Sequence, residues 1–354
     1  MIIRCRARDL GIAPGRFAPG PLNAITDIPG IRVGHITLRE GERIRTGATA
    51  ILPHGGNLFQ DKVPAGFAIL NGFGKFAGAT QVMELGEIET PIVLTNTLGV
   101  GRAIEAINRW TLAQPGNEQV TSVNAIVGET NDSRLSDIRA GYPGIEQIMQ
   151  AIEAGTTGAV EEGAVGAGTG TVAFGFKGGI GTSSRQLGMK QGGYLVGVLV
   201  QSNYGGELRI DGRRFKDLQP SAADTDGSIV LIVATDAPLS DRNLARLAER
   251  SFAGLARTGS ALSNGSGDYA IAFSTAAAVR RTPERRQTVS TIPDIPNDQL
   301  SPLFEAVIEA SEEAILNSLF MAETTTGWDV GKGKPARIDA LPLAALVAGT
   351  GARK

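Results

Sequence analysis

Residues 224–236 read Asp224-Thr225-Asp226-Gly227-Ser228-Ile229-Val230-Leu231-Ile232-Val233-Ala234-Thr235-Asp236, so that a polar run turns directly into an apolar one. The apolar run is rich in β-branched side chains, which fit a pleated surface that is covered on both faces. The sequence therefore predicts a buried core strand that begins at Ser228. A glycine directly before it permits unusual backbone angles and leaves its carbonyl open to approach.

The Gly227-Ser228 pair is a place where the chain could cut itself. The Ser228 hydroxyl could add to the Gly227 carbonyl, move the acyl group from nitrogen to oxygen and let water release a new N-terminal serine. The freed α-amine, with a pKa of roughly 8, would then serve as the base of that serine. The residue types alone also fit a plain turn before a strand, because Gly-Ser pairs are common there.

The overall composition is that of a globular protein in water. The chain has 354 residues, of which 42% are hydrophobic and 20% charged, and its net charge of −2 implies no general attraction to nucleic acid or to an anionic membrane. No run of roughly 18 apolar residues is present, so no membrane span is expected. The first residues lack the apolar core of a signal peptide, and we expect a cytoplasmic protein.

Cysteine and histidine are scarce, which limits the possible chemistry. The lone cysteine, Cys5, allows no disulfide within the chain and no cysteine-based metal site. The only histidines are His35 and His54, so a multi-histidine zinc centre is excluded, and a Ser-His-Asp triad would depend on one of them. We expect both to be solvated or hydrogen-bonded side chains, and we expect no metal and no cofactor.

The hydrophobic patterns predict strands and helices mixed through both halves of the chain, which favours one layered α/β domain over residues 1–354. A strand is expected to start at residue 31, and others at 47–52, 65–71, 91–95, 122–128 and 194–201. Helices are expected at 99–113, 144–154, 238–257 and 299–323. Residues 205–227 are expected to form an exposed connection, and residues 280–296 a surface loop.

Two glycine-rich segments need separate interpretations. Residues 163–171 suggest a phosphate loop, but an apparent strand follows them and the chain has no Gly-Lys-Ser/Thr, so nucleotide binding is disfavoured. In the second segment, Gly265-Ser266-Gly267-Asp268, a hydroxyl and a carboxylate stand two residues apart. Residues two apart in an extended segment point the same way, so Ser266 and Asp268 are predicted to face one site.

Several short motifs, taken together and in order, resemble the L-aminopeptidase/D-esterase family, which includes the β-peptidyl aminopeptidases. The resemblance covers nearly the whole chain. It rests on residues 27–35 (Asp-Ile-Pro-Gly-Ile-Arg-Val-Gly-His), residues 166–170 (Gly-Ala-Gly-Thr-Gly), residues 177–185 (Lys-Gly-Gly-Ile-Gly-Thr-Ser-Ser-Arg), Asn203, Gly227-Ser228 and Gly265-Ser266-Gly267-Asp268.

The resemblance implies an N-terminal-nucleophile-hydrolase-like fold, a four-layer α/β/β/α sandwich. It also implies an inactive precursor that cuts itself between Gly227 and Ser228. The products would be an α chain of residues 1–227 and a β chain of residues 228–354, which stay together and assemble into a homo-oligomer, typically a tetramer of αβ pairs.

The resemblance further implies roles for individual residues. Ser228 would be the nucleophile, and Ser266 and Asp268 would be the other members of a Ser-Ser-acid arrangement in which the family usually has glutamate as the acid. Asn203 would support the oxyanion, and Glu129 would hold the free amino group of the substrate. Asn131 stands where the family often has an aromatic residue.

The function expected from these observations is a self-processing serine aminopeptidase that acts on short peptides, amino-acid amides or esters, including those with D- or β-residues. An amidase acting on non-peptide oligomers is an alternative on the same architecture, although its nucleophile is usually threonine. A non-catalytic binding protein that kept the fold is a second alternative. Neither nucleic acid nor membrane is expected as a partner.

Overall fold

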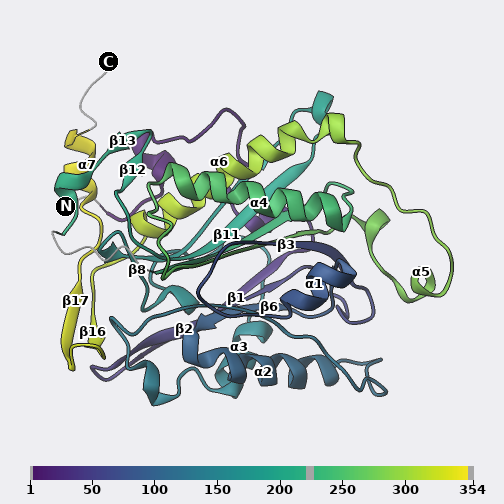
Figure 1. The fold of residues 1–354 in the computed structure, drawn as a ribbon, viewed down its shortest axis with the longest axis horizontal. Helices are drawn as coiled ribbons and strands as arrows, with labels where there is room; N and C mark the ends of the chain where they lie inside the picture. Colours follow the sequence, from purple (N-terminus) through teal and green to yellow (C-terminus); the bar gives the residue numbers. More distant parts are fainter. Residues whose placement is uncertain (1–2, 221–226, 350–354) are drawn as a thin grey trace.

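The structure is a computed structural model that describes residues 3–220 and 227–349. Residues 221–226, which include the first three residues of the segment quoted above, lie outside these ranges. Within the described ranges the chain forms four layers, in which two β-sheets lie face to face and helices cover the outer face of each sheet (Figure 1). None of the described helices has the length and apolarity that crossing a membrane would require.

The first sheet has the strand order β1-β2-β6-β7-β4. These strands are β1 (Arg32–Glu40), β2 (Ile44–Leu52), β6 (Ile92–Asn96), β7 (Ile126–Thr130) and β4 (Phe76–Ala77). Helices α2 (Val100–Leu112) and α3 (Ile145–Glu153) cover its outer face. Because β6 and β7 are parallel, with Asn96 opposite Thr130, the residues that follow both strands emerge at the same edge.

The second sheet has the strand order β10-β11-β14-β15-β3-β5. These strands are β10 (Gly179–Gln186), β11 (Leu195–Asn203), β14 (Ser228–Thr235), β15 (Gly267–Ser274), β3 (Val63–Gly72) and β5 (Glu87–Ile88). Helices α4 (Asp241–Arg257) and α6 (Ser301–Phe320) lie against its outer face (Figure 1). The side-chain hydroxyl of Ser240 accepts the Asn243 N–H and caps the start of α4.

The remaining elements are short. They are α1 (Ala79–Leu85), α5 (Pro283–Gln287), α7 (Leu343–Gly349) and the two-stranded ribbons β8 (Val172–Ala173) with β9 (Phe176–Lys177), β12 (Arg209–Ile210) with β13 (Arg213–Arg214), and β16 (Thr325–Asp329) with β17 (Lys334–Ile338). The β16–β17 ribbon projects along one side of the molecule (Figure 1).

Buried apolar side chains of the described residues fill each interface between layers. Strand β14 contributes to two of these cores, because alternate side chains point to opposite faces of a sheet. Ile229, Leu231 and Val233 face α4 and α6, whereas Val230 and Ile232 face the other sheet. Each such side chain contributes about 1.5–3 kcal/mol when fully buried. Burial on both faces explains why the segment is apolar at every position.

Most predicted elements are present close to their expected positions, but the edge strand β10 of the second sheet was missed. Strand β10 contains the sequence Gly-Ile-Gly-Thr-Ser-Ser-Arg-Gln and carries no apolar run. Its polar side chains are nevertheless buried, because other segments supply partners for them. Arg185 is the clearest case, since its guanidinium bonds to Glu309 at 3.1 Å and to Glu313 at 2.8 Å, both on α6.

The prediction that residues 205–227 form an exposed connection was wrong for part of the described segment. Leu208 and Ile210 are buried in the same core as the outward-facing side chains of β14, and the β12–β13 ribbon lies within this segment. The predicted loop at 280–296 also contains the short helix α5. Apolar residues spaced between charged ones in the 205–220 segment were the signal for this burial.

Candidate active site

The strand register brings Asn203, Ser228 and Gly267 side by side on neighbouring strands of the second sheet. Asn203 is the last residue of β11 and pairs with Ser228, the first residue of β14. Ser228 in turn pairs with Gly267, the first residue of β15, which lies between Ser266 and Asp268 in the chain. Groups that are distant in sequence therefore meet at one end of the second sheet.

Ser228 lies against the carbonyl group that precedes it. Its hydroxyl donates a hydrogen bond to the Gly227 carbonyl oxygen at 2.7 Å. The Gly267 N–H donates to the same carbonyl oxygen at 3.1 Å and also lies 3.3 Å from the Ser228 Oγ. An N–H aimed at a carbonyl oxygen stabilises the negative charge that develops when a nucleophile attacks. The arrangement therefore suits attack on the Gly227 carbonyl carbon.

Glycine is required at position 227 for steric reasons. A Cβ atom added there would lie 2.1 Å from the Asn203 carbonyl oxygen and 2.5 Å from the Tyr204 Cα. Both neighbours are backbone atoms of the adjoining chain segment, which cannot move aside cheaply. The absence of a side chain lets the backbone before Ser228 pass close to the end of β11.

Ser266 and Asp268, whose side chains were predicted to point the same way, are joined by a hydrogen bond. The Ser266 hydroxyl donates to Asp268 Oδ1 at 2.6 Å, so the shorter aspartate reaches its partner directly. Asp268 is completely buried, and its Oδ2 has no hydrogen-bond partner in the described part of the chain. Burial raises the pKa of Asp268, and hydrogen bonds from Ser266 and from the Ile229 backbone partly oppose the increase.

Asn203 is oriented by the neighbouring β8–β9 ribbon. Its side-chain Oδ1 accepts the Val172 backbone N–H at 2.9 Å. Because the oxygen of the amide is engaged in this way, the Nδ2 group is the end left to donate. The donor lies at the end of β11, beside Ser228 in the sheet, where an oxyanion-supporting residue would be placed.

Glu129 lies near the end of β7 and is buried. Its Oε1 accepts the Lys75 backbone N–H at 3.0 Å, and the Thr97 hydroxyl donates to its Oε2. The Lys75 ammonium is 3.7 Å from the same carboxylate, although the lysine side chain is 56% exposed. Glu129 thus already faces an ammonium group. Asn131 is exposed, and its Oδ1 accepts the Ser133 N–H at 3.0 Å.

Four of the predicted catalytic and substrate-binding residues border a cavity of about 550 Å³. Ser228, Asn203, Glu129 and Asn131 all line it, whereas Ser266 and Asp268, which flank Gly267 in the chain, do not. The other residues of its wall are Phe73, Lys75, Thr97, Ser133, Arg134, Val172, Gly227, Asn264 and Gly265.

Five charged or polar wall residues were not among the predicted site residues, namely Lys75, Thr97, Ser133, Arg134 and Asn264. Thr97 directly follows β6, and a hydroxyl at the carboxyl end of a parallel strand was a signal that could have been used. Lys75 and Arg134 carry no such signal, because each lies in an irregular segment whose path depends on tertiary contacts.

His35 and His54 are hydrogen-bonded structural residues, as expected, and neither lines the cavity. His35 Nδ1 lies 2.9 Å from the Thr49 hydroxyl, and His54 Nε2 lies 2.7 Å from the Asp61 carbonyl oxygen. Their positions leave no histidine of the described chain in the wall around Ser228, so the base must be another group.

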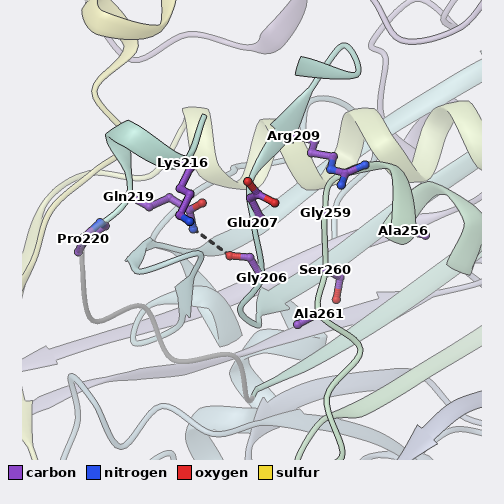
Figure 2. Close-up of a pocket in the computed structure, with 10 residues that line it drawn as sticks. All are labelled: Gly206, Glu207, Arg209, Lys216, Gln219, Pro220, Ala256, Gly259, Ser260 and Ala261. Atoms are coloured by element: carbon purple, nitrogen blue, oxygen red, sulfur yellow. Dashed lines mark hydrogen bonds between the residues drawn. The ribbon is translucent and has the colours of Figure 1, made fainter. Parts of the chain in front are cut away.

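A larger cavity, of about 660 Å³, lies elsewhere. Figure 2 shows that the segment containing Gly206, Arg209 and Gln219 and the segment from Ala256 to Ala261, at the end of α4 and after it, form its wall. Within this wall, Gln219 Nε2 donates to the Gly206 carbonyl oxygen at 3.0 Å. None of the predicted site residues lines this cavity, so chemistry rather than volume identifies the site.

The chain is similar in sequence to known peptidases. The model of peptidase family S58 matches residues 23–332. The β-peptidyl aminopeptidase BapA of Sphingosinicella microcystinivorans is 40% identical over 352 residues, which cover 91% of this chain and 87% of the relative.

Solved structures are similar as well. The PH0078 protein from Pyrococcus horikoshii OT3 superposes with a TM-score of 0.90 at 44% identity, over 97% of this chain and 98% of that one. The L-aminopeptidase D-Ala-esterase/amidase of Ochrobactrum anthropi, described as a prototype serine aminopeptidase and a variant of the Ntn hydrolase fold, gives a TM-score of 0.88 at 34% identity, over 98% of both chains. The predicted N-terminal-nucleophile-hydrolase-like fold is confirmed.

Proposed function

The chain belongs to peptidase family S58 and is a serine aminopeptidase, and we propose that it is made as an inactive precursor that activates itself by cutting before Ser228. The observation that carries this proposal is the pair of hydrogen bonds on the Gly227 carbonyl oxygen. One comes from the Ser228 hydroxyl at 2.7 Å and the other from the Gly267 N–H at 3.1 Å. The nucleophile and an oxyanion donor therefore converge on the bond to be broken.

The self-cleavage proceeds in two steps. The Ser228 Oγ adds to the Gly227 carbonyl carbon, the Gly267 N–H stabilises the resulting oxyanion, and the C–N bond breaks as the Ser228 nitrogen takes up the proton. Water then hydrolyses the ester. The products are an α chain that ends in the Gly227 carboxylate and a β chain that begins with the free amine of Ser228, residues 1–227 and 228–354 respectively.

The peptidase reaction uses the same hydroxyl. Glu129 binds the free ammonium group of the substrate, and Ser228 attacks the carbonyl carbon of the first residue. The freed α-amine of Ser228, or Ser266 paired with Asp268, takes the hydroxyl proton and returns it to the leaving amine. Asn203 Nδ2 donates to the oxyanion, a contact typically worth about 3 kcal/mol. Water then releases the acyl group from Ser228.

The proposed substrates share a free amino group next to the scissile acyl group. They are short peptides, amino-acid amides and esters, with D- or β-residues included, since a curated relative is named a β-peptidyl aminopeptidase. We further propose assembly of the αβ pairs into a homo-oligomer and a cytoplasmic location. Sedimentation of the purified protein and fractionation of cells test these two points.

The function is tested by hydrolysis of alanine p-nitroanilide and of its N-acetylated form. We expect the wild type to hydrolyse the free-amine compound, and the N-acetyl compound to be resistant because it offers no ammonium to Glu129. Ser228→Ala should lower the rate by roughly a thousandfold or more. Equal hydrolysis of both compounds, or full activity of the Ser228→Ala variant, would contradict the proposal.

A further inference from the structure

Arg134 is a half-buried arginine in the wall of the catalytic cavity, and no described residue pairs with its charge. Within residues 3–220 and 227–349 its guanidinium makes neither an ion pair nor a hydrogen bond. Arg280, which is also half-buried, instead bonds to the Asp61 carboxylate at 2.7 Å. A guanidinium that has lost part of its hydration and has no partner is suited to bind a carboxylate through two parallel hydrogen bonds.

Hydrogen bonds on both sides of Arg134 fix the backbone that carries it. The Ser133 carbonyl oxygen accepts the Val330 N–H at 2.9 Å, and the Leu135 carbonyl oxygen accepts the Trp328 N–H at 3.0 Å. Both donors belong to the β16–β17 ribbon or its turn. The loop is therefore anchored before any substrate binds, which lowers the ordering cost of a contact made by Arg134.

The charges in the cavity wall do not balance. Among the described residues, the charged members of the wall are Lys75, Glu129 and Arg134, which leave one excess positive charge. A substrate ammonium that binds Glu129 adds another positive charge to the cavity. A substrate with a negative group as well would balance the additional charge, whereas an amide or an ester supplies none.

We propose that Arg134 binds the terminal carboxylate on the leaving half of the substrate, so that the enzyme prefers short peptides with a free C-terminus over amides and esters. This inference rests on the proposed function, because it assumes that Glu129 holds the ammonium end. Both Arg134 and Glu129 line one cavity of about 550 Å³, so the two charged ends of the substrate must lie within it. That restriction favours peptides of two or three residues.

The test compares alanyl-alanine with its C-terminal amide, which share the ammonium group and the scissile bond. We expect the wild type to favour the free acid in kcat/KM by about tenfold or more, the effect of one charged hydrogen bond. Arg134→Met should bring the ratio close to one by raising the KM of the acid. Arg134→Lys should restore part of the preference because it keeps the charge.

Arg209→Met is the matched control. Arg209 is likewise half-buried and makes no side-chain hydrogen bond or ion pair within the described residues, but it lines the other cavity (Figure 2). This variant should keep the wild-type ratio. Equal losses on both substrates in Arg134→Met, or a wild type with no preference for the acid, would overturn the inference and leave the aminopeptidase function standing. No hydrolysis of either substrate by the wild type would overturn the proposed function itself.

Discussion

Asp268 and Glu313 are both completely buried carboxylates, but in the part of the chain that the structure describes only Glu313 has a cation beside it. Glu313 bonds to Arg185 at 2.8 Å and to Arg8 at 2.9 Å. Asp268 is bonded to the Ser266 hydroxyl and keeps Oδ2 without a hydrogen-bond partner in the described chain. The burial of Glu313 is offset by paired charges, whereas that of Asp268 is offset only by neutral donors.

The difference indicates two purposes for a buried charge. Glu313 joins the N-terminal arm and β10 to α6, so it connects the parts that would become separate chains after the proposed cut. Asp268 lies beside the nucleophile, and burial raises its pKa. A buried carboxyl group with a raised pKa is characteristic of sites that transfer protons. Neutralising Asp268 should therefore lower activity, whereas neutralising Glu313 should lower stability.

The largest expected effect is on the activity of Asp268→Asn. The variant keeps the shape of the side chain but removes the charge that holds and polarises the Ser266 hydroxyl. We expect kcat to fall by roughly a hundredfold or more, as when an acid–base group is lost. Steady-state kinetics with alanine p-nitroanilide measures the change. Glu313→Gln, which neutralises the other buried carboxylate, should remain within a few-fold of the wild type, and a reversed pattern would break the comparison.

The next effect is on the stability of Glu313→Gln. Removing one charge leaves Arg185 completely buried and paired only with Glu309. We expect the free energy of unfolding to fall by about 3 kcal/mol, as is usual when a buried ion pair loses a partner. Urea unfolding at neutral pH provides the measurement. An unchanged midpoint would show that the network contributes little to stability.

A smaller effect is expected in the pH dependence of stability. Burial raises the pKa of Asp268 in the folded chain above the value of about 3.9 that an aspartate has in the unfolded chain. As the pH rises past that value, the unfolded chain loses the carboxyl proton before the folded chain does. The wild type therefore loses stability as the pH rises through that window. Asp268→Asn lacks this loss, so it should melt at a higher temperature than the wild type at pH 7 and at a similar temperature near pH 4. A variant that melts lower at pH 7 would contradict the assignment.

The smallest effect concerns Glu129, whose pairing with a cation is weaker than that of Glu313. Its cation, Lys75, is 56% exposed, and the ammonium lies 3.7 Å from the carboxylate. A substrate ammonium must compete with this lysine. Lys75→Met should lower KM for free-amine substrates by about two- to fivefold, in keeping with the small value of exposed ion pairs. An increase in KM would indicate that Lys75 helps to bind the substrate.

The fold and the nucleophile could largely be predicted from the sequence because their signals are local. The apolar run after Ser228 predicted a doubly covered strand, and the structure places its alternate side chains in two cores. The two-residue spacing of Ser266 and Asp268 predicted that they face the same way, and they bond at 2.6 Å. Helical periodicity located α2, α3, α4 and α6 within a few residues.

The rest depended on contacts between distant segments. The sequence of strand β10 is polar, and the strand is buried at the edge of the second sheet, where α6 supplies carboxylates for Arg185. Lys75 and Arg134 enter the cavity wall through irregular segments, and no periodic pattern marks them. Sequence spacing could not show that Asp268 would lack a cation or that Glu313 would have two, because the partners of each come from other parts of the chain.

The most direct test of the central claim is the intact mass of freshly purified protein under denaturing conditions, with Ser228→Ala measured beside it. The wild type should yield two chains, one of which begins Ser-Ile-Val-Leu and has the mass of residues 228–354. The Ser228→Ala variant should remain a single chain near 36.8 kDa. A wild-type protein that hydrolyses alanine p-nitroanilide yet stays a single chain after prolonged incubation at neutral pH would contradict activation by self-cleavage.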